Sequence, residues 1–253
     1  MKKFVLVGAA LAALLVTPAM SADMPAKAPS APSYVPPAPS WTGLYVGANI
    51  GYMWAKTTGN FAPFNTQFPW DAPYNSAFGG AQVGFNWQFY QFVIGVEASL
   101  DGNINGKRGS TVGNSLAGPC GFPPSTSCQA NIAYVSSVGG RLGWTPWSQW
   151  LFFAQGGWAN ADISTNGLIN GTNTVFSPTS THRQNGWFVG GGVDFAITPI
   201  VSIGVDYKHY DFNSDTHPDV LLSHNNDRVI KATADAVFAR VNIKLWGPGG
   251  VIH

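Results

Sequence analysis

Seven charged residues are the first candidates for chemistry, because each stands in a segment where apolar residues alternate with small or polar ones. They are Glu97, Arg141, Asp194, Asp206, Lys208, Arg240 and Lys244. Four of the seven are basic and three are acidic, so the set can form salt bridges, line an ion path, or hold a carboxylate pair for proton transfer. The segments that carry these residues decide which of these applies.

The two cysteines, Cys120 and Cys128, lie eight residues apart in a stretch rich in Gly, Pro and Ser. In an oxidising compartment we expect them to form a local disulfide that pins a loop. A zinc site is disfavoured, because two cysteines without a nearby pair of histidines make a poor ligand set.

Histidines provide two other candidates. His182, His217 and His224 fall in predicted long loops near aspartates, but their irregular spacing favours solvated loops over a metal or haem contact. His209 lies on the outer face at the end of a predicted strand, where a barrel hydrolase acting on lipid can keep a catalytic histidine. No Ser and carboxylate partners are evident on that face. We therefore expect no catalytic residues, no metal site and no cofactor.

Charge is scarce in the whole chain. Of its 253 residues, 45% are hydrophobic, 13% are aromatic and only 10% are charged, whereas typical soluble proteins have about 25% charged residues. Past residue 20 no apolar run approaches the roughly 18 residues of a membrane helix, so a polytopic helical membrane protein is excluded. A typical soluble enzyme is disfavoured, because too few charges remain to solvate its surface. The net charge is close to zero, which implies no nucleic-acid partner.

The chain begins with the parts of an export signal: Lys2 and Lys3, an apolar run over residues 4–16, and small residues that permit cleavage before Ala22. Residues 1–21 are therefore predicted to be a signal peptide. Residues 22–40 are rich in Pro, Ala and Ser, which prevents sheet pairing and favours an extended periplasmic linker. Residues 247–253 are predicted to be a C-terminal tail.

Eight segments show the period-2 alternation of β-strands, over residues 44–54, 81–89, 92–100, 134–144, 150–158, 187–197, 201–208 and 237–245. The connectors alternate in length. Those around Tyr90, Pro146 and Pro199 are short, and those that begin near Lys56, Gly102, Ser164 and Asn213 are long, running to roughly twenty residues. Short turns at one end and long loops at the other are typical of outer-membrane barrels. We therefore predict an all-β fold, an eight-stranded antiparallel up-and-down transmembrane β-barrel, over residues 41–246.

The two faces of the predicted strands differ in charge. One face is uncharged through its middle, and the other holds the seven charges with many glycines and amides. That polar face has too little charge for an ordinary water-exposed exterior, so we expect apolar side chains on lipid and polar ones in the lumen. Seven tryptophans fall at the strand ends, as in interfacial girdles. Trp87, Trp144, Trp150 and Trp246 lie near the short turns, and Trp54, Trp158 and Trp187 lie near the long loops.

The lumen of an eight-stranded barrel is just wide enough for side chains to fill. We expect the seven charges to form a belt there. Because an unpaired buried charge is very costly, we interpret the belt as a salt-bridge plug. A narrow ion path lined by the same residues is the functional alternative, and a proton relay or catalytic carboxylate pair is a third.

Several motifs resemble those of one family. They span residues 41–47 (WTGLYVG), 84–88 (GFNWQ), 92–97 (FVIGVE), 141–143 (RLG), 186–194 (GWFVGGGVD), 198–199 (TP) and 206–212 (DYKHYDF). Their order and spacing are similar to the small outer-membrane immunogenic protein family, eight-stranded barrels of Gram-negative bacteria often labelled porin-like. The resemblance implies an antigenic outer-membrane surface protein that contributes to envelope integrity and has no catalytic residues. Asp194 and Asp206 depart from the Glu expected at these positions, and the tail moves the terminal assembly signal inward.

The leading hypothesis is therefore a non-enzymatic barrel of the outer membrane with a structural and antigenic role. Its expected partners are outer-membrane lipid, the outer-membrane assembly machinery, and unidentified extracellular ligands at the four long loops. The alternative function is a narrow porin-like diffusion channel, and a barrel enzyme acting on lipid is a weaker one. Conductance of the purified protein separates the first two hypotheses.

Overall fold

The computed structural model describes residues 39–61, 68–106, 109–112, 126–169, 174–217 and 228–251. The chain divides into two compact units, Met1–Pro36 and Pro37–His253, and the described residues belong to the second. The predicted signal peptide, most of the predicted linker, Cys120 and His224 lie outside the described residues. No helix in the described ranges is long and apolar enough to cross a membrane.

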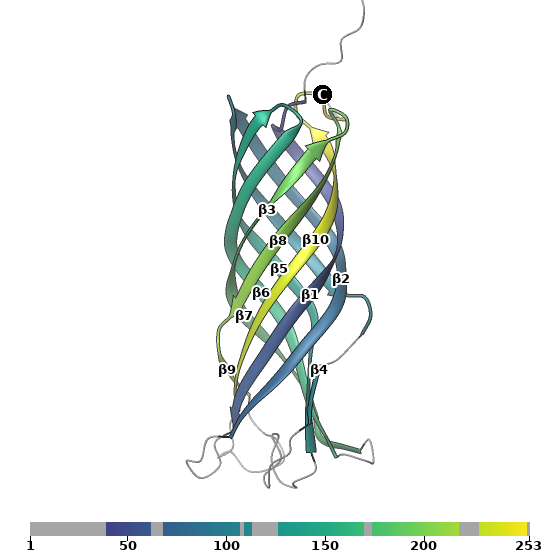
Figure 1. Cartoon of the computed structure of the whole chain (residues 1–253), viewed down its shortest axis with the longest axis vertical. Helices are drawn as coiled ribbons and strands as arrows, with labels where there is room; N and C mark the ends of the chain where they lie inside the picture. Colours follow the sequence, from purple (N-terminus) through teal and green to yellow (C-terminus); the bar gives the residue numbers. More distant parts are fainter. Residues whose placement is uncertain are drawn as a thin grey trace, which may run out of the picture. The chain divides into compact units, whose positions relative to one another are not determined.

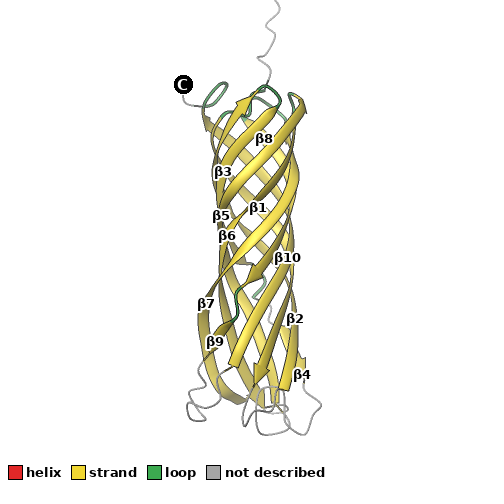
Figure 2. Cartoon of the chain, turned by 90° about the vertical axis from the view of Figure 1, so that its left-hand side faces the viewer, coloured by secondary structure: helices red, strands yellow, loops and turns green. Residues whose placement is uncertain are grey.

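Eight long strands form the barrel (Figures 1 and 2). They are β1 (Gly43–Phe61), β2 (Phe68–Phe89), β3 (Phe92–Asn103), β5 (Thr126–Trp147), β6 (Trp150–Ile169), β7 (Thr174–Ala196), β8 (Val201–Phe212) and β10 (Arg228–Trp246). Each pairs antiparallel with the next, and β1 also pairs with β10 from Leu44↔Trp246 to Phe61↔Arg228. That pairing closes the sheet, so the predicted eight-stranded antiparallel barrel is confirmed. Two short strands, β4 (Gly109–Val112) and β9 (Asp215–His217), pair with β5 and β10 where β3 and β8 have ended.

The predicted short turns all lie at one end of the barrel, which is at the top of Figure 1. Tyr90 and Gln91 alone join β2 to β3, and Tyr90 takes a positive φ of 53°. The turn between β7 and β8 is fixed by Thr198, whose Oγ1 accepts hydrogen bonds from the backbone N–H groups of Ile200 and Val201 at 3.2 and 2.9 Å. We call this end of the barrel the turn side and the opposite end the loop side.

The strands extend further toward the loop side than the sequence pattern predicts. Strand β1 continues to Phe61 and β2 begins at Phe68, so only residues 62–67 lie between them. Likewise only residues 170–173 separate β6 from β7. The expectation of connectors of about twenty residues is therefore wrong at these two places. In these stretches the apolar residues, such as Ala159, Ala161 and Ile163, occupy the inward face, and polar residues occupy the outward one. A search for strands that keep one continuous apolar face therefore ends before them.

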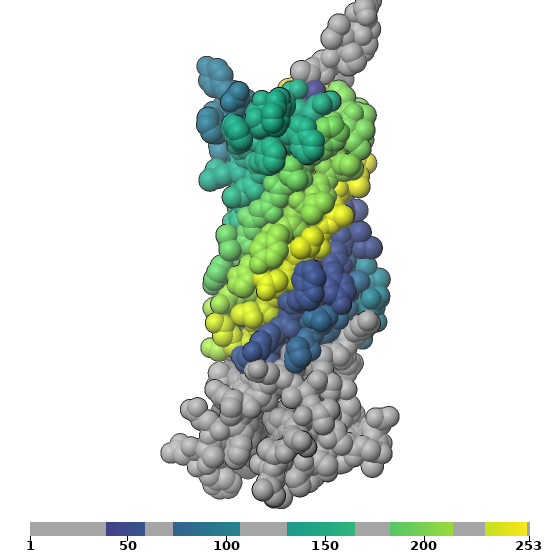
Figure 3. Space-filling model, in the orientation of Figure 1, coloured from purple at the N-terminus to yellow at the C-terminus, as the bar shows by residue number. Residues whose placement is uncertain are grey.

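The outward face of the barrel is apolar between two bands of aromatic side chains. All seven predicted girdle tryptophans point outward and are between 38% and 62% exposed. We call Trp87, Trp144, Trp150 and Trp246 the turn-side girdle, and Trp54, Trp158 and Trp187 the loop-side girdle. Between them β8, β10 and β1 lie side by side (Figure 3) and carry exposed Ile203, Val205, Val241 and Ile50.

The interior is filled with side chains in successive layers. At the turn side, buried Trp41, Val93, Leu151 and Ala196 form an apolar cluster that we call the mouth layer. The next layer holds buried charged and amide side chains. Toward the loop side follows an apolar cluster, the apolar core, made of Met53, Ala55, Tyr74, Phe78, Ile132, Val135, Ala159, Ala161, Ile163, Phe188, Tyr210, Phe212, Ala232, Ala234, Ala236 and Phe238.

The polarity of the two faces reverses beyond the loop-side girdle. On the outward face Lys231 pairs with Asp211 at 3.2 Å, and Arg183 pairs with Asp162 at 3.4 Å. Inward neighbours of these residues, such as Ala161, Ile163, Tyr210, Phe212 and Ala232, belong to the apolar core. The expectation of a polar lumen is therefore wrong for the loop-side half, where the barrel is apolar inside and polar outside as soluble proteins are.

Candidate functional site in the barrel lumen

Six of the seven predicted belt residues meet in the lumen, and we call them the charge network. They are Glu97 on β3, Arg141 on β5, Asp194 on β7, Asp206 and Lys208 on β8, and Arg240 on β10. Each is at most 6% exposed. Period-2 alternation places all six on the inward face, and closure of the barrel then brings β3 and β10 within reach of each other.

Arg240 is the most connected member of the charge network. Its guanidinium donates to both carboxylate oxygens of Glu97, with Nη1 at 3.2 Å from Oε1. Its Nε lies 3.6 Å from Asp194 Oδ1, and its Nη1 lies 3.9 Å from Asp206 Oδ1. One cation from the last strand therefore contacts carboxylates from three other strands.

Arg141 and Lys208 complete the pairing. Arg141 donates to Asp194 and lies 3.4 Å from Glu97 Oε2. Lys208 Nζ lies 4.0 Å from both Glu97 and Asp206. Three cations thus face three carboxylates within the network, and their pairing offsets the high cost of burying each ion.

The sequence prediction missed two ionisable members of this layer. Tyr45 donates to Glu97 Oε2 at 2.7 Å and accepts from Arg141 at 3.1 Å. Asp101 is 1% exposed and accepts hydrogen bonds from Asn49 at 2.8 Å and Ser99 at 2.9 Å. Both residues stand at odd-numbered, inward positions of their strands. Tyr45 already lay on the polar face of the predicted segment 44–54 but carries no formal charge, and extending the alternation of residues 92–100 by one residue places Asp101 in the lumen.

Inward glycines make room for these side chains. A Cβ on Gly204 would lie 2.0 Å from Asp194 Oδ1, and one on Gly84 would lie 2.3 Å from the Tyr45 hydroxyl. A Cβ on Gly80 would lie 2.4 Å from Asp101 Oδ1. The network side chains therefore lie across the glycines of neighbouring strands, which explains why glycine crowds the same face as the charges.

Aromatic rings separate the network from the layers on either side. The guanidinium carbon of Arg141 lies 3.5 Å from the ring centre of Phe153, a cation–π distance. Lys208 Nζ lies 5.7 Å from the ring centre of Phe188 and 5.9 Å from that of Phe238, which both belong to the apolar core. Charges enclosed in this way interact strongly, because water is largely excluded.

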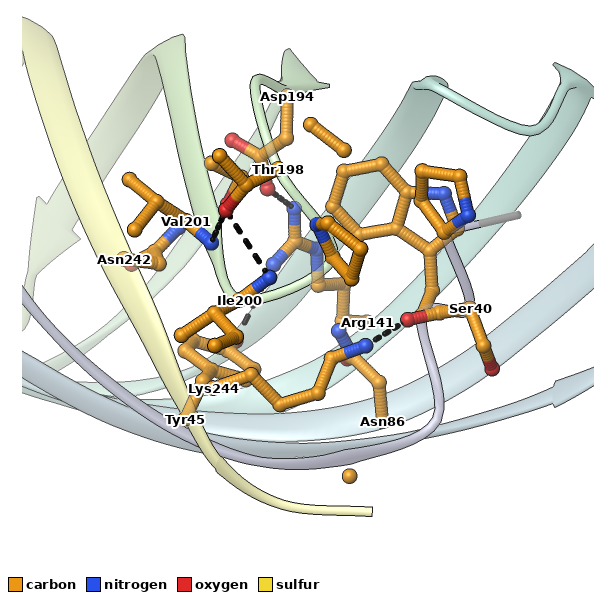
Figure 4. A pocket seen from close by; sticks show the side chains of 16 residues that line it. Ser40, Tyr45, Asn86, Arg141, Asp194, Thr198, Ile200, Val201, Asn242 and Lys244 are labelled. Carbon is orange, nitrogen blue, oxygen red and sulfur yellow. Dashed lines mark hydrogen bonds and ion pairs between the residues drawn. The ribbon is translucent and has the colours of Figure 1, made fainter. Parts of the chain in front are cut away.

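Lys244 does not join the charge network. Its ammonium donates to the backbone carbonyls of Ser40 and Pro248, the latter at 3.3 Å. It lines a cavity of about 30 Å³ at the turn-side mouth, together with Arg141 and Asn86 (Figure 4). The prediction that all seven charges form one belt is therefore wrong for Lys244. This residue lies at the turn-side end of β10, where the segments before β1 and after β10 contact it through their backbone carbonyls.

A second polar cluster lies on the outward face beside the loop-side girdle. His209 Nδ1 donates to Asp235 Oδ1 at 2.7 Å, and the Tyr207 hydroxyl donates to the same oxygen at 2.5 Å. Trp187 packs with its ring centre 5.9 Å from that of His209. The expectation that His209 has no carboxylate partner is wrong, because strand pairing sets His209 opposite Asp235 from a distant part of the sequence.

The predictions on metal and disulfide chemistry concern other parts of the chain. Among the described side chains, no group of three or more His, Cys, Asp or Glu is arranged to hold a metal ion. Cys128 lies in β5, but Cys120 lies outside the described residues, so the disulfide stays a prediction.

Comparison with known proteins gives the family. Residues 9–237 match the outer membrane protein beta-barrel domain model. The 31 kDa outer-membrane immunogenic proteins of Brucella melitensis and Brucella suis are each 28% identical over 220 residues, which cover 84% of this chain and 88% of theirs. The crystal structure of the outer membrane protease OmpT from Escherichia coli matches with a TM-score of 0.50 at 9% identity, covering 81% of this chain and 97% of that one, a likeness of fold alone. The chain therefore belongs to the outer membrane protein beta-barrel domain family and resides in the bacterial outer membrane.

Proposed function

We propose that the protein is a closed structural barrel of the outer membrane that supports surface-exposed connectors and conducts neither ions nor solutes. The single observation that carries this proposal is the filling of the lumen by three consecutive layers: the mouth layer, the charge network and the apolar core. An ion crossing this lumen has to pass through all three. Each layer opposes it for a different physical reason.

The charge network opposes conduction because its members are already paired. A mobile ion that replaces one partner leaves another buried charge uncompensated, at a cost of several kcal/mol. The apolar core opposes conduction because aliphatic and aromatic side chains make up most of it, and an ion that enters it loses most of its hydration. The narrow diffusion channel is disfavoured for these two reasons together.

The antigenic role is proposed from position and from the relatives. Connectors at the loop side of outer-membrane barrels face the cell exterior, and the strands of this barrel continue for several residues beyond the loop-side girdle. The two Brucella relatives are named immunogenic. We propose the same surface exposure for the connectors of this chain, with the filled barrel as their rigid support and a contribution to envelope integrity.

The test is single-channel recording on protein purified from outer membranes and inserted into planar bilayers. We expect no sustained openings from the unmodified protein. Lys231→Ala, which alters an exterior lysine, serves as the matched control for Arg141→Ala. Sustained openings whose size changes in Arg141→Ala but not in Lys231→Ala overturn the plug and support the channel.

The proposal also states that the barrel is not a lipid-acting enzyme. The His209–Asp235 pair is the described feature closest to catalytic geometry, because a carboxylate orients the imidazole as in hydrolytic triads. Turnover of phospholipid or lipid A by the purified protein, lost in His209→Gln, would overturn this part of the proposal.

A further inference from the structure

The cavity at the turn-side mouth has the properties of a binding site that the plug does not use (Figure 4). Its volume of about 30 Å³ is room for about two water molecules or one small anion. Its lining combines Trp41 and Ser40, which precede the barrel, with inward side chains of the strands and with the turn between β7 and β8. The site is therefore assembled only when the strands and the segment before β1 are all in place.

Lys244 gives the cavity a positive charge that is not compensated locally. Its ammonium contacts the carbonyl oxygens of Ser40 and Pro248, and within the described ranges no carboxylate lies at ion-pair distance from it. The carboxylate of Asp194 also lines the cavity, but it is already paired with Arg141 and Arg240. Net charge at the cavity wall is therefore positive.

Two buried N–H donors at the cavity wall have no hydrogen-bond partner. They are Trp41 Nε1 and Arg141 Nε, and the two residues are 7% and 2% exposed. Buried donors are almost always satisfied in native proteins. A ligand that accepts hydrogen bonds and carries negative charge would satisfy both donors and offset the charge of Lys244. The side-chain oxygen of Asn86, also unpaired at this wall, can accept from a water beside such a ligand.

We propose that this cavity binds one small monovalent anion, with the charge and size of chloride or of a formate-sized carboxylate. Lys244 supplies the charge, and the N–H groups of Trp41 and Arg141 supply directed hydrogen bonds, which are stronger when the acceptor is ionised. The site lies at the end of the barrel that faces the periplasm, so its ligand is drawn from periplasmic solutes. Binding there ties the segment before β1 to the end of β10 without opening the lumen.

The test is the line width of the chloride-35 NMR signal with the purified protein in a nonionic detergent, at constant ionic strength with gluconate as the other anion. We expect excess broadening that saturates with chloride and is reversed by bromide. Lys244→Met is expected to reduce the excess broadening at least fivefold. Trp41→Phe keeps the aromatic ring in the mouth layer but removes the N–H, and we expect it to weaken binding about threefold to tenfold.

Lys231→Met is the matched control, because Lys231 lies on the barrel exterior and pairs with Asp211. It should leave the broadening unchanged, and the compact gel mobility of unboiled protein shows that each variant is folded. Broadening that is non-saturable, or equal in the unmodified protein and Lys244→Met, means that the cavity holds water only and overturns the proposal. Displacement of chloride by formate supports a site that also binds small carboxylates. If formate does not displace chloride, the proposal that the cavity binds a formate-sized carboxylate is overturned.

Discussion

The turn-side and loop-side halves of the barrel use the same strands with opposite polarity. Between the two girdles apolar side chains lie outside and the charge network lies inside, whereas beyond the loop-side girdle members of the apolar core such as Ala161, Ile163 and Ala232 lie inside and ion pairs lie outside. Which face of a β-barrel strand is apolar therefore depends on whether lipid or water surrounds the barrel at that height. Where lipid surrounds the barrel, interior cohesion has to come from ion pairs and close packing. Where water surrounds it, burial of apolar side chains stabilises the interior as in any soluble protein.

The largest loss of stability is expected from a change in the charge network. Arg240→Met removes the guanidinium that contacts the three carboxylates of the network. Breaking a buried ion pair from one side costs about 3–5 kcal/mol, so we expect a loss of that size in the free energy of unfolding, measured by urea titration in detergent micelles. Lys231→Met, which breaks an exposed pair, should cost about 0–1 kcal/mol. If both variants lose the same free energy of unfolding, the charge network does not stabilise the turn-side half more than an exposed ion pair does.

A pair of lysine substitutions on the outward face of β1 locates the boundary between the halves. Ile50→Lys places a charge between the girdles and should cost about 2–4 kcal/mol. Thr58→Lys lies beyond Trp54 and directly opposite Lys231, so its cost, from repulsion between like charges, should be about 1 kcal/mol or less. The same urea titration measures both. If Thr58→Lys proves as costly as Ile50→Lys, the reversal of polarity does not mark the membrane boundary.

Glycine substitutions compare the crowded interior with the open exterior at smaller expected cost. A methyl group at Gly204 meets the Asp194 carboxylate at 2.0 Å, and overpacking of this kind costs about 1–3 kcal/mol. Gly140 faces outward, and a Cβ there has no atom within 4 Å. Gly140→Ala is therefore the control and should leave stability unchanged or slightly raised. A neutral Gly204→Ala would show that the network can shift without loss.

The smallest effect is expected at the polar cluster beside the loop-side girdle. His209→Gln removes one hydrogen bond to Asp235, which stays bonded to Tyr207. A single hydrogen bond contributes about 0.5–1.5 kcal/mol, and partial exposure places this one at the low end. Urea titration should therefore give a loss below about 1 kcal/mol. A loss above 2 kcal/mol would show that the cluster anchors the strands where they leave the membrane.

The turn-side half could be predicted from the sequence, because contact with lipid requires an apolar outward face on every strand. Alternation placed Glu97, Arg141 and Arg240 in the lumen, and the short connectors gave the order of the strands. The alternation within one strand does not fix its register against other strands. It therefore predicted neither the hydrogen bonds of Tyr45 with Glu97 and Arg141 nor the pairing of His209 with Asp235. The separate position of Lys244 depends on the contacts of Ser40 and Pro248, which follow from the closed fold alone.

The loop-side half was missed, although its signal is present in the sequence. In β10, Lys231, Thr233 and Asp235 point outward and alternate with inward alanines. From Val237 onward the outward residues are apolar and the inward ones include Arg240. The period of two continues through this point while its polarity reverses. A search for strands with a single apolar face begins the last strand at Val237, and it leaves the preceding nine residues of β10 to a loop.

Closure of β1 against β10 has a consequence for assembly. Arg240 lies on the last strand to be synthesised, and its partner Glu97 is 143 residues earlier in the chain. Until that strand arrives, the carboxylates of β3, β7 and β8 lack their most connected cation, and contacts of such long sequence separation form late in folding. The six members of the network are therefore fully paired only when β10 joins β1 and β8, so the step that closes the sheet also completes the electrostatics of the lumen.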